Sequence, residues 1–127
     1  MVGTTLVNEW IEAGKRLTEA LDRESFELVA SLWYYDAENG DWRLIIASPL
    51  VDRQGPLEAY RVVQKVLGDL KLENLNLNDI SVVSPGHTIV KLLGIALKTG
   101  KEISGIRFTR NRINDQFIED AYIYRLT

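Results

Sequence analysis

The strands that this sequence predicts carry apolar side chains on both faces, and this constrains the fold more than any other feature. In the segment 26–35 every second residue is apolar, and Val29, Trp33 and Tyr35 add apolar side chains on the opposite face. The segments 42–48 and 117–126 repeat the pattern. A strand with one solvent-exposed face alternates apolar and polar residues, so these strands must be covered on both sides.

The remaining periodicity predicts three helices and two more strands. Apolar residues recur at helical spacing over 5–22, from Pro56 to Leu70 and over 87–98, while short apolar runs at 80–84 and 103–110 predict strands. Asn39-Gly40 predicts a type I′ turn, because these residues tolerate its two positive φ angles. No linker divides the chain, so we expect one domain over 1–127. The predicted class is α+β: a mixed, largely antiparallel sheet of about five strands with three helices, in the order αββαβαββ.

Two of the predicted strands end in the same dipeptide and are separated by a helix. Ser48-Pro49 and Ser84-Pro85 follow apolar strands, and a βαβ crossover makes such strands parallel. Their carboxyl ends then lie at one edge of the sheet, where ligands tend to bind in α/β sheets. The predicted ligand-binding residues at this edge are Ser48, Asp52, Arg53, Ser84, His87 and Thr88. A helix N-terminus nearby favours a small anionic ligand.

The same edge allows a hydrolase as an alternative, because Ser48, Ser84 and His87 with Asp52 are the residue types of a nucleophilic triad. Both serines are followed by proline, however, so neither lies in a Gly-x-Ser-x-Gly elbow. A simpler interpretation is that Ser84 is a turn or helix-capping residue and that His87 lies in the first turn of a helix with a solvated ring. We therefore expect a non-catalytic protein that binds a partner protein or a small ligand.

The two-sided strands also predict a second subunit. Three helices cover one face of a sheet fully and the other in part, and the helix over 87–98 is itself apolar almost all round. We therefore expect a two-fold homodimer that uses Trp33, Tyr35 and Tyr122 or Tyr124 as interface anchors. The alternative is a monomer whose helices pack on both faces of a strongly curved sheet.

The arginines of the segment 106–112 suggest an RNA-associated accessory protein as a further alternative. Arg107, Arg110 and Arg112 alternate with apolar and polar residues around Phe108, and arginines beside aromatic rings suit single-stranded RNA. The segment lacks the glycine and aromatic spacing of an RNA-recognition motif. We expect the arginines to face solvent or to pair with Glu119 and Asp120 on the facing strand. The net charge of −3 also argues against a generally basic nucleic-acid binder.

The composition argues against metals and cofactors. The chain has no cysteine and one histidine, which excludes thiolate zinc sites, iron–sulfur clusters and two-histidine metal motifs. Glu119 and Asp120 are adjacent, and adjacent strand residues point to opposite faces unless a bulge intervenes. We therefore expect no metal site and no cofactor.

The compartment is predicted from two further features. The first ten residues lack the basic and apolar regions of a signal peptide. The apolar run 89–97 contains Lys91 and is much shorter than the ~20 residues that span a bilayer. We expect a cytoplasmic protein without membrane association.

The segments 42–50, 103–108 and 118–125 together resemble small single-domain bacterial proteins of uncharacterised function. The similarity extends over most of the chain. It implies a bacterial source and a stand-alone domain, and it carries over no activity, cofactor or catalytic residue.

Overall fold

A mixed five-stranded sheet in the order β3-β2-β1-β5-β4 forms the centre of the protein in a computed structural model that describes residues 5–127. Residues 1–4, part of the segment that argues against a signal peptide, lie outside the described range. The elements are α1 (Asn8–Asp22), β1 (Ala30–Asp36), β2 (Asp41–Ala47), α2 (Leu50–Gln54), α3 (Pro56–Leu70), the 3-10 turn η1 (Leu77–Asp79), β3 (Ile80–Val83), α4 (Thr88–Ala96), β4 (Ile106–Ile113) and β5 (Gln116–Leu126).

The α+β class and the crossover are confirmed. β2 and β3, which α3 separates in the sequence, are neighbours in the sheet and pair in parallel. The pairs β1–β2, β1–β5 and β4–β5 are antiparallel. The predicted helix count is low by one, because the five-residue helix α2 follows Ser48-Pro49 directly. β4 also begins at Ile106 and not at 103, next to Gly105, where a Cβ atom would collide with the Tyr122 hydroxyl.

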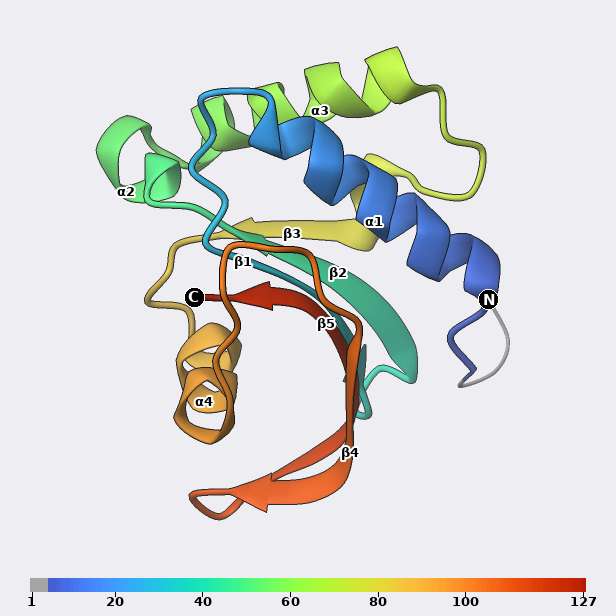
Figure 1. Ribbon diagram of the computed structural model, residues 1–127, viewed down its shortest axis with the longest axis vertical. Helices are drawn as coiled ribbons and strands as arrows, with labels where there is room; N and C mark the ends of the chain where they lie inside the picture. Colours follow the sequence, from blue (N-terminus) through green and yellow to red (C-terminus); the bar gives the residue numbers. More distant parts are fainter. Residues whose placement is uncertain (1–4) are drawn as a thin grey trace.

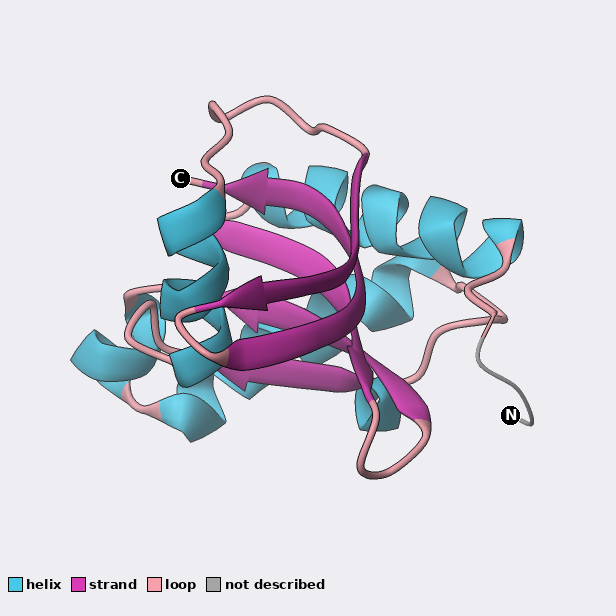
Figure 2. Cartoon of the chain, turned by 90° about the horizontal axis from the view of Figure 1, so that it is seen from below, coloured by secondary structure: helices cyan, strands magenta, loops and turns pink. Residues whose placement is uncertain are grey.

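Helices cover both faces of the sheet (Figure 1). α1 and α3 lie on one face, over a core that includes Trp33, Leu44 and Tyr124. α4 lies on the other face, over Leu32 and Ile123, and the curved β4–β5 hairpin continues around it. Figure 2 shows the same arrangement from below, with the β4–β5 hairpin toward the viewer. The arrangement removes the reason for placing a second subunit on these faces.

The turn with two consecutive positive φ angles lies in the β4–β5 hairpin and not, as predicted, in the β1–β2 hairpin. Between β1 and β2 the loop has four residues and only Gly40 has a positive φ, of 66°, so the predicted type I′ turn at Asn39-Gly40 is wrong. The Asp36 carboxylate closes this loop by accepting from the Glu38 N–H and from Asn39 Nδ2. Two consecutive positive φ angles occur instead at Asn114 and Asp115, between β4 and β5. Asparagine and aspartate tolerate that conformation because their side chains bond locally.

Candidate ligand-binding site

Ser48 lies at the predicted sheet edge and is fully committed to the backbone. Its N–H donates to the Val83 carbonyl at 3.0 Å, so the ends of β2 and β3 meet as the crossover predicts. Its side chain is fully buried, and its hydroxyl donates to the Phe26 carbonyl and accepts from the Leu50 N–H. Ser48 therefore anchors the start of α2 and has no access to a ligand.

Ser84 has the predicted turn role, whereas His87 is the N-cap of α4 and not, as predicted, a first-turn residue with a solvated ring. The Ser84 hydroxyl accepts from the Gly86 N–H at 2.9 Å, and His87 Nδ1 accepts from the Ile89 N–H at 3.2 Å as the N-cap of α4. Burial lowers the pKa of His87, which favours the neutral ring with its proton on Nε2. Because the Nδ1 lone pair already accepts the Ile89 N–H, the neutral ring has no free nitrogen to act as a general base.

The other residues predicted for this edge do not converge with them. Asp52 and Thr88 are exposed, and exposed Arg53 pairs with Glu27 across the surface. A cavity of about 420 Å³ beside His87 is lined by Ser81 and by neither Ser48 nor Ser84. The Ser81 hydroxyl accepts from Arg43 Nε and Nη2. The predicted edge is real, but it does not gather its polar side chains into one site.

The arginines of β4 are largely engaged with β5. Arg107 donates to both oxygens of Asp120 at 2.6 Å, and this hydrogen bonding raises the pKa of Arg107. Its guanidinium also lies 5.8 Å from the centroid of the Trp42 ring. Arg112 lies over the ring of Phe117, at 5.9 Å from its centroid. The predicted pairing of Arg107 with Asp120 is thus confirmed.

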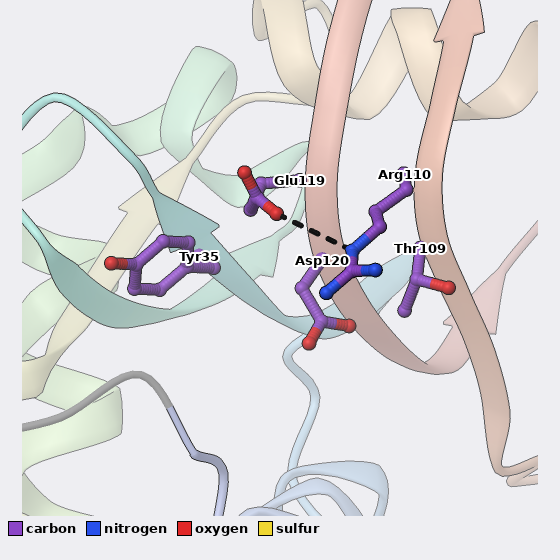
Figure 3. A pocket seen from close by; sticks show the side chains of 5 residues that line it. All are labelled: Tyr35, Thr109, Arg110, Glu119 and Asp120. Atoms are coloured by element: carbon purple, nitrogen blue, oxygen red, sulfur yellow. Dashed lines mark ion pairs between the residues drawn. The ribbon is translucent and has the colours of Figure 1, made fainter.

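Arg110 occupies a kink in β4 that opens a cavity of about 440 Å³ (Figure 3). Its φ is 45°, which is uncommon for a residue with a long side chain. Tyr35, Thr109, Glu119 and Asp120 complete the lining. Both carboxylates therefore face the same cavity, and the expectation that they point to opposite faces is wrong.

The change of direction in β5 explains why the two carboxylates meet. Ile118 and Ala121 both belong to the α4 side of the core, although they are three residues apart. Regular alternation would put them on opposite faces, so the strand is irregular between them. No sequence signal marks this irregularity, because the left-handed residue opposite it is an arginine and not a glycine or an asparagine.

The two carboxylates of the cavity differ in their partners: Asp120 is held by Arg107, and Glu119 forms a long ion pair with Arg110. Asp120 is saturated by Arg107. Arg110 Nε and Glu119 Oε2 are 3.9 Å apart, beyond hydrogen-bond distance, and the two side chains are 82% and 41% exposed. The Tyr35 ring forms a wall and directs its hydroxyl away from the charged pair (Figure 3). The cavity thus offers a guanidinium and a carboxylate that are paired only loosely with each other and are open to solvent.

Two of the predicted interface anchors, Trp33 and Tyr124, lie beneath α1. Trp33 and Tyr124 are 2% and 1% exposed, Tyr35 is buried and Tyr122 is half-buried. Trp33 Nε1 donates to the Trp10 carbonyl at 3.2 Å, and the Tyr124 hydroxyl donates to the Ile11 carbonyl at 2.6 Å. The first helix of the same chain therefore covers Trp33 and Tyr124, whereas Tyr35 lines the Arg110 cavity.

Residues 5–127 contain no group of three His, Cys, Asp or Glu side chains placed to hold a metal ion. None of the helices described in that range has the length and apolarity needed to cross a membrane. Comparisons with protein-family models, with curated proteins and with solved structures find no match to the chain.

Proposed function

We propose that the protein is a cytoplasmic, non-catalytic binding module of bacterial origin, and that its ligand site is the Arg110 cavity. The observation that carries the proposal is the open Arg110–Glu119 pair beside a satisfied Arg107–Asp120 pair. Strained backbone conformations such as that of Arg110 cluster at functional sites. A cavity of about 440 Å³ is also in the size range of small-molecule sites.

The chemistry of the pair favours a zwitterion of the α-amino acid class. A ligand carboxylate binds the Arg110 guanidinium, and a ligand ammonium binds Glu119. The two protein groups are 3.9 Å apart, so a ligand that carries both charges on one carbon reaches them together. The Tyr35 ring then bounds the space for the ligand side chain.

The test is a titration of the full chain with glycine, glutamate, lysine and phenylalanine, followed by NMR shifts of the Thr109 and Glu119 amides. We expect saturable shifts with at least one amino acid and at least a tenfold loss of affinity in Arg110→Gly and in Glu119→Gln. Glycine accepts the positive φ at position 110, so that variant keeps the kink. Arg61→Ala, which removes an exposed arginine of α3, is the matched control. Absence of shifts with all four probes, or equal affinity in Arg110→Gly, contradicts the proposal.

The alternatives have weaker support. A hydrolase at the Ser48, Ser84 and His87 edge needs a free serine beside a free imidazole nitrogen, whereas the Ser48 hydroxyl and His87 Nδ1 are bonded to the backbone. An RNA-binding strand needs free arginines, whereas Arg107 is held by Asp120.

Self-association remains part of the proposal, on a surface other than the predicted anchors. Phe117, near the tip of the β4–β5 hairpin, is half exposed and is one apolar side chain available for it. Light scattering at micromolar concentration is expected to give the mass of a dimer. A monomer that persists across a concentration series removes this part of the proposal.

A further inference from the structure

We propose that a groove beside α4 binds a medium-chain alkyl carboxylate, independently of the Arg110 cavity. The groove has a volume of about 320 Å³ and lies between α4 and the ends of the strands. Its apolar lining consists of Val29, Pro85, Val90, Ile95 and Leu126.

Ile95 is the clearest sign that this side of α4 lacks a cover. Its side chain is 61% exposed, whereas Val90, Leu92 and Leu93 of the same helix are buried. An exposed β-branched apolar residue beside a groove is a favourable contact for an alkyl chain, because burying it removes apolar surface from water.

Gly94 leaves a notch in the groove that no internal packing requires. A Cβ atom built there meets only the Lys98 ammonium within 4 Å, at 3.9 Å. Glycine inside a helix is less favourable than alanine, and close packing does not explain its presence here. The open space lies next to a cation.

The charges of the groove favour an anion. Lys91 and Lys98 line it beside the carboxyl-terminal residue Thr127, and no Asp or Glu side chain does. Like the other lysines in the described part of the chain, neither has an ion-pair partner. A ligand carboxylate at Lys98 pairs with the lysine charge, and its alkyl chain then covers the Gly94 notch and the exposed Ile95 side chain. The volume lies at the lower end of the range for small-molecule sites, so the groove suits one short chain better than a diacyl lipid.

The experiment is a calorimetric titration of the full chain with octanoate and decanoate, each below its micelle concentration. We expect one site and an affinity that rises about fourfold per methylene group, as for burial of a CH₂ group. Decyltrimethylammonium has the same chain with the opposite charge and is expected to bind at least tenfold more weakly than decanoate. Lys98→Met, which keeps an apolar stem, is expected to lower decanoate affinity about tenfold.

Gly94→Leu fills the notch and is expected to abolish decanoate binding. Gly68→Leu, in the exposed surface of α3 where a Cβ atom meets nothing within 4 Å, is the matched control and is expected to bind as the parent does. Ile95→Ser, at an exposed position, is a second variant with an expected loss of binding if Gly94→Leu does not fold. Arg110→Gly is expected to bind decanoate normally, which separates this proposal from the Arg110 cavity.

Three results overturn the proposal. The first is no saturable binding of either carboxylate, and the second is decanoate binding that both groove variants, Gly94→Leu and Ile95→Ser, leave intact. The third is a change of oligomeric state in the folded groove variants, which assigns the groove to a second copy of the chain.

Discussion

At the scale of single residues, Gly14 determines how closely α1 approaches the sheet. A Cβ atom at this position would lie 2.8 Å from Trp33 Nε1 and would overlap the Tyr124 hydroxyl. One turn later, the Thr18 hydroxyl bonds to the Gly14 carbonyl and to the Ser31 hydroxyl, both at buried positions. The helix therefore lies on the aromatic rings because it presents no side chain at this point.

Gly14→Ala is expected to lower the free energy of unfolding by about 1–3 kcal/mol, the range for inserting a methyl group into a filled core. Gly68→Ala in α3 is expected to raise it by about 0.5–1 kcal/mol, since helical alanine is favoured and space is free. Urea denaturation measures both. Equal effects of the two substitutions would falsify the role assigned to Gly14.

His87 makes the stability of the protein depend on pH. Protonation removes the Nδ1 acceptor that caps α4, and burial lowers the pKa of His87 in the folded state. The unfolded chain then binds the proton more readily, from its ordinary pKa of about 6.5. The contribution of His87 to the free energy of unfolding is therefore fully present above about pH 7 and declines as the pH falls below about 6.5.

Denaturant titrations between about pH 7.5 and 5.5, where ordinary carboxyl groups remain ionised, measure this decline. His87→Asn keeps a capping oxygen without a titrating group, so we expect a nearly flat profile for that variant. An unchanged slope in His87→Asn contradicts the assignment.

At the scale of elements, side chains satisfy N–H groups on both edge strands. The Val82 N–H of β3 donates to the Tyr60 hydroxyl of α3 at 3.1 Å, and the Arg112 N–H of β4 donates to Asn111 Oδ1 at 3.0 Å. Open strand edges pair readily with other chains. These bonds and the kink at Arg110 make both edges of this sheet poorer templates for pairing.

Tyr60→Phe is expected to expose the Val82 N–H and to cost about 1 kcal/mol, the usual contribution of one hydrogen bond. Amide exchange at Val82 is then expected to accelerate about fivefold. Tyr34→Phe is the control, because the Tyr34 hydroxyl has no hydrogen bond within residues 5–127. Faster exchange at Val82 in both variants, or in neither, argues against the role of Tyr60.

At the scale of the whole molecule, Arg125 connects four segments. It donates to both oxygens of Asp22 at the end of α1, at 2.6 and 2.8 Å, and to the carbonyls of Leu28 and Lys101. The Arg125 side chain is buried, whereas that of Asp22 is partly exposed. Removing the carboxylate thus leaves a buried cation without its counter-charge.

Asp22→Asn is expected to lower the free energy of unfolding by about 1.5–3 kcal/mol, as for loss of hydrogen bonds to a charged group. Glu58→Gln breaks the exposed Glu58–Arg61 pair of α3 and is expected to change it by less than about 0.5 kcal/mol. Urea denaturation of both variants tests the difference. A small effect of Asp22→Asn indicates that water replaces the carboxylate.

The sheet was predictable because its strands carry apolar residues at both odd and even positions, which indicates burial on both faces. The crossover followed from the order of strands and helices. α2 was missed because five residues after Pro49 show no helical period. The predicted second subunit rests on helix number, whereas the alternative of a strongly curved sheet agrees with the position of Ile113 and Ile118 of the β4–β5 hairpin against the α4 core. The Arg110 cavity was not predictable, since it depends on a left-handed arginine.

The position of β5 in the sheet has a consequence for folding kinetics. β5 is the last strand of the chain, yet it lies between β1 and β4, and Ala30 pairs with Leu126. Closing such a long loop is slow, because its entropy is lost before the contacts form. During synthesis the β1–β2 hairpin and the α3 crossover emerge first, and the sheet stays open until residue 126 has left the ribosome. Until then β1 has one unpaired edge, which is the period when the nascent chain is most exposed to aggregation.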